Sequence, residues 1–121
     1  MNHPMAYASR EDRGAVEIEA ALAAAREDAE RVRAEFVDGL PPDSLAYDVE
    51  WTTRYGSEDR LIFIFSVVLD LDEKLRMRDY PREAVNQVIA DLRRRLVGTR
   101  VDAWGVWVVT IALRPKPSSD D

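Results

Sequence analysis

The stretch that decides the fold runs from Leu61 to Glu73 and reads LIFIFSVVLDLDE. Side chains alternate between the two faces of a strand, so this run predicts a strand that is apolar on both faces. A strand of that kind belongs at the centre of a sheet. The carboxylates that follow it, Asp70, Asp72 and Glu73, mark the start of a loop.

The segment before this strand predicts its hairpin partner. Residues 46 to 55 read AYDVEWTTRY and alternate between apolar and polar side chains, which is typical of a strand with one solvated face. The residues between the two segments, 56 to 59, read GSED and predict a turn.

Two helices and a further strand complete the predicted fold. Residues 9 to 38 predict a helix with a narrow apolar stripe in heptad spacing, made of Ala15, Ile18, Leu22, Ala25, Ala29, Val32 and Phe36. The stripe fits a helix on its own sheet, and it also fits a helix that pairs between subunits. Pro81 opens a second helix that ends at Gly98. Residues 99 to 114 predict the third strand.

The order α-β-β-α-β predicts an α+β fold. A strand, helix and strand in series form a right-handed crossover, so the third strand should run parallel to the second. We expect a three-stranded mixed sheet with two helices mainly on one face. The domain should span residues 9 to 114, between a flexible segment 1 to 8 and a disordered acidic tail 115 to 121.

Two helices on one face of this sheet leave its other face uncovered. On the second and third strands the side chains predicted to point away from the helices are largely apolar, and they are Ile62, Ile64, Val68, Trp104, Val106 and Val108. An exposed apolar patch of several hundred Å² usually marks an interface. The sequence therefore predicts a homodimer that meets through this face, either sheet to sheet or by edge pairing into a larger sheet. The alternatives are that the first helix covers the face, or that a different protein or an apolar ligand does.

Composition limits the function classes further. The chain has 121 residues, no Cys and a net charge of -6, which argues against disulfides, thiolate zinc sites and nonspecific nucleic-acid binding. The longest apolar run is far below the ~20 residues that span a bilayer. We expect a cytoplasmic protein that binds no membrane and needs no cofactor.

Two weak chemical signals remain. Asp70 and Asp72, with Glu73, form a candidate site for Mg²⁺ or Mn²⁺ in a phosphoesterase or nuclease. The alternative is that these acids only end an apolar strand. His3 is the only His, and no glycine-rich nucleotide motif occurs, so we expect neither His-based catalysis nor nucleotide binding through a glycine loop.

The second signal is basic. Arg93, Arg94, Arg95 and Arg100 form a candidate RNA-binding region near Trp104. The order of elements resembles that of KH-type RNA-binding domains, but their GXXG clamp is absent, so the resemblance extends to architecture alone. The sequence favours a small non-enzymatic interaction protein, in the manner of an antitoxin, immunity or inhibitor subunit, with a metal-dependent phosphoesterase and an RNA-binding module as alternatives.

Overall fold

A computed structural model describes residues 4 to 70 and 81 to 115 of the chain. The elements are α1 (Pro4–Asp38), β1 (Ala46–Tyr55), the short 3-10 turn η1 (Ser57–Asp59), β2 (Leu61–Asp70), α2 (Arg82–Leu96), α3 (Arg100–Ala103) and β3 (Trp107–Arg114). No helix in these ranges is both long and apolar enough to cross a membrane.

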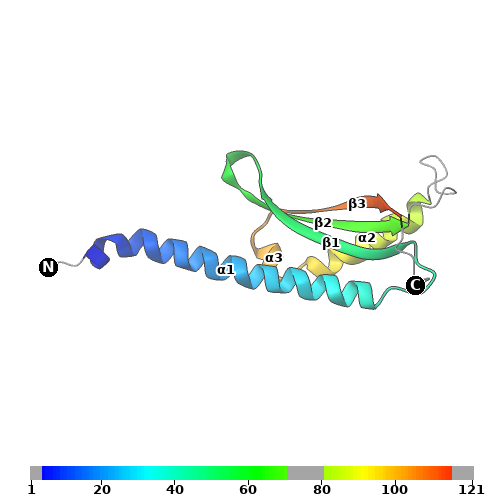
Figure 1. Cartoon of the computed structure of the whole chain (residues 1–121), viewed down its shortest axis with the longest axis horizontal. Helices are drawn as coiled ribbons and strands as arrows, with labels where there is room; N and C mark the ends of the chain where they lie inside the picture. Colours follow the sequence, from blue (N-terminus) through cyan, green and yellow to red (C-terminus); the bar gives the residue numbers. More distant parts are fainter. Residues whose placement is uncertain (1–3, 71–80, 116–121) are drawn as a thin grey trace.

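The three strands form one mixed sheet in the order β1-β2-β3. β1 and β2 are antiparallel, and β2 and β3 are parallel, as the right-handed crossover predicts. Figure 1 shows the helices gathered below the sheet, on one of its faces. The predicted α+β class, the mixed sheet and the placement of the helices are therefore confirmed.

The core lies between β2 and the helices. Phe63, Phe65, Val67 and Leu69 alternate along β2, point toward the helices and are fully buried. They pack with Val32 and Phe36 of α1, Val85, Leu92 and Leu96 of α2, and Val49 of β1. This burial explains why β2 is the central strand, because each large apolar side chain buried in the core stabilises the fold by about 2 kcal/mol.

The hairpin has the predicted turn and one irregularity. Trp51 stands opposite Phe65 and Tyr55 opposite Leu61, but the register shifts between Ala46 and Asp48. Ala46 and its partner Leu69 are both buried in the core. Because of the shift, Asp48 does not point to the same face as Ala46, and Val49 is the next residue of β1 that is buried.

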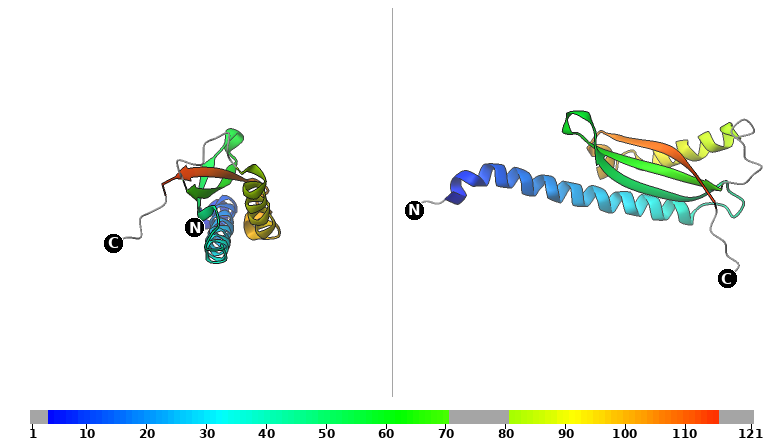
Figure 2. Two further views of the ribbon diagram at one scale, coloured as in Figure 1. Left: turned by 90° about the vertical axis from the view of Figure 1, so that its right-hand side faces the viewer. Right: turned by 45° about the horizontal axis from the view of Figure 1, so that its top comes forward.

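Helix α1 begins at Pro4, before the Ser9 that the sequence predicts. Its apolar stripe is buried from Leu22 to Phe36, so this part packs on its own sheet. Val16 and Ile18 are exposed, because the N-terminal half of the helix extends beyond the sheet, as Figure 2 shows.

The third strand is present, but the prediction that it begins at residue 99 is wrong. Thr99 caps α3, its hydroxyl accepting a hydrogen bond from the Asp102 backbone N–H, and β3 begins only at Trp107. Gly98 and Gly105 have φ of 84° and 76°, a left-handed conformation that favours glycine, and they bound this single helical turn. The order is therefore α-β-β-α-α-β.

Two sets of hydrogen bonds hold the α3 turn against the rest of the molecule. Asp28 of α1 accepts hydrogen bonds from the backbone N and the guanidinium of Arg100, at 2.7 Å and 2.8 Å for the two shortest. Asp102 accepts one from the indole Nε1 of Trp107 at 3.0 Å and one from the backbone N of Gly98 at 3.1 Å. The first contact fixes α3 to α1, and the second fixes the start of β3.

Candidate protein interface at the edge of the sheet

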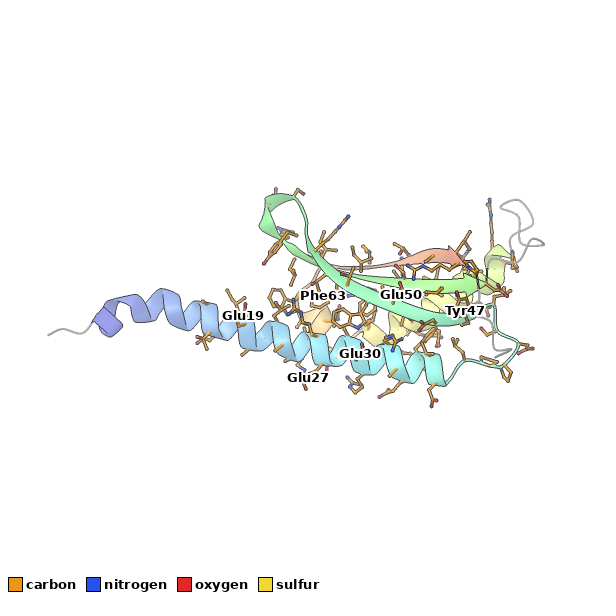
Figure 3. The ribbon with its side chains drawn as sticks, in the orientation of Figure 1. Glu19, Glu27, Glu30, Tyr47, Glu50 and Phe63 are labelled. Carbon is orange, nitrogen blue, oxygen red and sulfur yellow. The ribbon has the colours of Figure 1, made fainter. Side chains whose placement is uncertain are left out.

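The outer face of the sheet, which the sequence predicts to be bare, is closed by polar groups at one end. The Tyr47 hydroxyl donates to the carbonyl of Pro115 at 3.1 Å, and Arg114 forms an ion pair with Glu50. Because β2 lies between β1 and β3, these contacts pass over it; Figure 3 labels Tyr47 and Glu50 at that end of the sheet. Val68, which stands opposite Asp48, is only 2% exposed.

Two of the six predicted interface residues are therefore corrected. Val68 is buried in the single chain and offers no surface. Trp104 lies in the turn after α3, where its ring packs on Phe63 with the centroids 6.4 Å apart, so it does not point outward from a strand. The turn at Gly105 is the physical reason, because it interrupts the alternation that the sequence argument assumed for residues 99 to 107.

The other four predicted residues remain on a smaller patch. Ile64 stands opposite Val108 in the β2–β3 register, and Val106, whose carbonyl accepts from the N–H of Phe63, lies beside Ile62. All four are at least partly exposed. A hydrogen bond between Ser66 and Thr110, at 3.1 Å, separates this patch from the polar end.

The two edges of the sheet differ in a way that the sequence argument missed. At the β1 edge, side chains satisfy the backbone of Val49: its N–H donates to Asp48 Oδ1 at 2.8 Å, and its C=O accepts from Arg33 Nε at 2.7 Å. Arg33 Nη2 closes the ring on Asp48 Oδ1 at 3.1 Å. Charged side chains on an edge strand are a common means of blocking strand addition.

The β3 edge has no such protection among the described residues. Phe63 donates to the carbonyl of Val106, and in a parallel ladder alternate residues turn their backbone groups to the same neighbour. Val106, Val108, Thr110 and Ala112 therefore face β2. Trp107, Val109, Ile111 and Leu113 turn their N–H and C=O groups to the free edge, where no described residue meets them.

The side chains along this edge are also unusual for a surface. Val108 is 42% exposed, Ile111 39% and Leu113 36%. Residues 107 to 113 contain no charged residue and no proline, and the β2–β3 register is unbroken. Asp102 accepts a hydrogen bond from the indole of Trp107 and so holds it in place at the start of the strand. This hydrogen bond and the one from the Gly98 backbone lower the pKa of the Asp102 carboxyl. The free edge of β3 is thus regular and apolar, and a hydrogen bond holds its first residue.

The four predicted RNA-binding arginines lie at the end of α2 and the start of α3, and three of them contact acids. Arg94 and Arg95 pair with Asp91 at 2.9 Å and 3.4 Å. These contacts lower the pKa of Asp91, and the hydrogen bond from Arg94 is the largest cause. Arg95 also lies over the ring of Phe36, 5.7 Å from its centroid. Arg100 is bound to Asp28. These contacts partly neutralise the basic region that the sequence suggests.

The predicted carboxylate site is described only in part. Asp70 is partly exposed at the end of β2, where its backbone N–H donates to the Leu45 carbonyl at 3.4 Å. Asp72 and Glu73 lie outside the described residues. Within the described ranges, no three His, Asp or Glu side chains lie close enough together to hold a metal ion.

Comparison of the chain with protein-family models, with curated proteins and with solved structures finds no match.

Proposed function

We propose that this chain is a small non-enzymatic interaction protein that homodimerises through its sheet. The contact surface is the free edge of β3, and Val108 connects this edge to the outer-face patch of Ile62, Ile64, Val106 and Val108. The observation that carries the proposal is the contrast between the two edges. Arg33 and Asp48 occupy the backbone of Val49 at the β1 edge, whereas no described side chain occupies the backbone donors and acceptors of the β3 edge, which lie among exposed apolar side chains.

The energetics favour a strand as the binding partner. In the single chain, water satisfies the free backbone groups of β3, so each new hydrogen bond contributes only about 1 kcal/mol. Most of the gain would come from the side chains, since covering Val108, Ile111 and Leu113 removes apolar area from water at about 25 cal/mol per Å². Adding a strand achieves both effects at once.

A homodimer also agrees with the class that the sequence favours. Accessory subunits of the antitoxin, immunity or inhibitor type act by contact with another macromolecule. Dimerisation through the sheet leaves the exposed half of α1, with Val16 and Ile18, available for a second partner.

Light scattering after size-exclusion chromatography tests this proposal. The unmodified chain should have about twice its 13.8 kDa monomer mass. Ile111→Lys places a charge on the free edge and should give monomer, because a buried unpaired charge opposes strand addition. Val16→Lys makes the same kind of change at an exposed site on α1 and should leave the dimer intact. An unmodified chain that stays monomeric at high concentration would refute the proposal.

A further inference from the structure

We infer that the strand added to β3 is β3 of a second copy, antiparallel to the first, with Thr110 on the twofold axis between them. This inference rests on the proposed homodimer and specifies its geometry. It follows from three features of β3: the alternation of its backbone groups, the residues that bound it, and the pattern of its exposed side chains.

The alternation restricts the possible registers. Only Trp107, Val109, Ile111 and Leu113 present backbone groups to the free edge, so in a symmetric antiparallel pair these residues must stand opposite one another. The axis must then pass through a residue of the strand. With Thr110 on the axis, Val109 stands opposite Ile111 of the partner subunit, and Trp107 opposite Leu113 of the partner subunit.

Neighbouring registers lose contacts for identifiable reasons. An axis at Ile111 would place Trp107 opposite Pro115 of the partner subunit, which has no N–H to donate. An axis at Val109 would place Leu113 opposite Gly105 of the partner subunit, whose φ of 76° is not that of a strand. The Thr110 register alone pairs all four edge residues, with about eight hydrogen bonds between the subunits.

The same register covers the exposed side chains. Ile111 and Leu113, both more than a third exposed, meet Val109 and Trp107 of the partner subunit on the helix side. On the outer side Val108 meets Ala112 of the partner subunit. No charged residue stands opposite another. This self-complementarity and the match in strand length favour a second copy over a foreign strand.

The net charge of the chain adds an electrostatic signature to this dimer. Each copy has a net charge of -6 at pH 7, so two copies repel each other at low salt. Raising the salt from about 20 mM to about 300 mM should therefore tighten the dimer, because salt screens this repulsion.

The chain has no Cys, so single engineered cysteines report on the register directly. The backbone groups of Thr110 face β2, which makes the Thr110 pair a non-hydrogen-bonded pair with Cα atoms about 4.5 Å apart. That distance lies within the range for a disulfide. Under mild oxidation Thr110→Cys should crosslink nearly completely. Val108→Cys alone should not, but it should crosslink when mixed with Ala112→Cys.

The outcomes distinguish the register from the dimer itself. If light scattering shows a dimer but Thr110→Cys fails to crosslink, and the mixed Val108→Cys and Ala112→Cys chains also fail, the register is wrong and the homodimer stands. If the unmodified chain is a monomer, both proposals fall. The mixed pair also covers the case in which loss of the Thr110 hydroxyl weakens folding, because it leaves Thr110 in place.

Discussion

Replacing Asp28 by Asn should destabilise the fold through the contact between α1 and α3. The Asp28 side chain is nearly buried, with the residue 5% exposed, and its carboxylate accepts from the Arg100 backbone N at 2.7 Å, from Nε at 3.2 Å and from Nη2 at 2.8 Å. Arg31 contacts it as well, at 3.3 Å. Asn keeps the shape but removes the charge, and it turns an N–H₂ donor toward groups that are themselves donors.

The magnitude follows from the exposure of the two partners. Breaking a buried ion pair commonly costs about 3 to 5 kcal/mol. The Arg100 side chain is 56% exposed, so its guanidinium can return to water, and the main loss is the charge-assisted bond to the Arg100 backbone. We expect Asp28→Asn to lower the free energy of unfolding by about 2 kcal/mol. That corresponds to a fall in Tm of roughly 6 to 10 °C.

The pH dependence of this loss has a definite sign. The hydrogen bond from Arg100 is the largest cause that holds the pKa of Asp28 far below its ordinary value of 3.8. A carboxyl with a depressed folded-state pKa stabilises the fold above its unfolded-state pKa, and the contribution is lost as the pH falls further. The difference between the unmodified chain and Asp28→Asn should thus be constant near neutral pH and shrink below about pH 4.

Urea denaturation monitored by tryptophan fluorescence at several pH values measures this difference. Glu35→Gln is a suitable control, because Glu35 is exposed and its contact with Arg31 is long, at 3.7 Å. It should change the unfolding free energy by less than about 0.5 kcal/mol. An Asp28→Asn chain that unfolds within that same margin of the unmodified chain, at neutral pH, would refute the reasoning.

Four further substitutions test the core, a turn and helix α1 by the same denaturation measurement. Phe65→Ala empties the centre of the core and should cost about 4 kcal/mol, so a loss below about 2 kcal/mol would contradict the packing described. Gly98→Ala should cost about 1 kcal/mol from its φ of 84° alone, because an added Cβ meets nothing within 4 Å; no loss would mean that the turn relaxes. Ile18→Ser should leave the free energy of unfolding and the mass of the proposed dimer nearly unchanged, because Ile18 is exposed. Leu22→Ala, one turn further on, should lower the free energy of unfolding by about 2 kcal/mol. Equal effects of the two substitutions would contradict the exposure of Ile18 described above.

The elements that the sequence predicts well are those in which local pattern and tertiary packing agree. The alternation of Phe63, Phe65, Val67 and Leu69 is the core pattern itself, so the central strand and its hairpin follow from it. The start of β3 does not follow, because residues 99 to 106 carry both a β-like composition and a helix cap. The spacing of Thr99 and Asp102 is the capping signal, and it prevails because Asp28 and Arg100 stabilise the turn from outside.

The candidate interface depends on contacts between residues far apart in the chain. Tyr47 reaches Pro115, and Arg33 reaches the backbone of Val49, and no local periodicity reveals either contact. These two contacts decide which part of the sheet is closed and which edge is blocked. One signal was present in the sequence: the run WVVTIAL from residue 107 to 113 has no charged side chain, which is rare for a strand at the edge of a sheet.

The ring of hydrogen bonds among Arg33, Asp48 and Val49 has a consequence for the size of any assembly. A sheet with two open edges can grow without limit, as amyloid fibrils do, because every added chain offers a new edge. Here a chain joined at β3 presents its β1 edge outward, and side chains already occupy the backbone of Val49 on that edge, which should oppose growth beyond two copies. If the proposed dimer forms, Arg33 and Asp48 are therefore the residues whose loss should favour further growth of the sheet at β1.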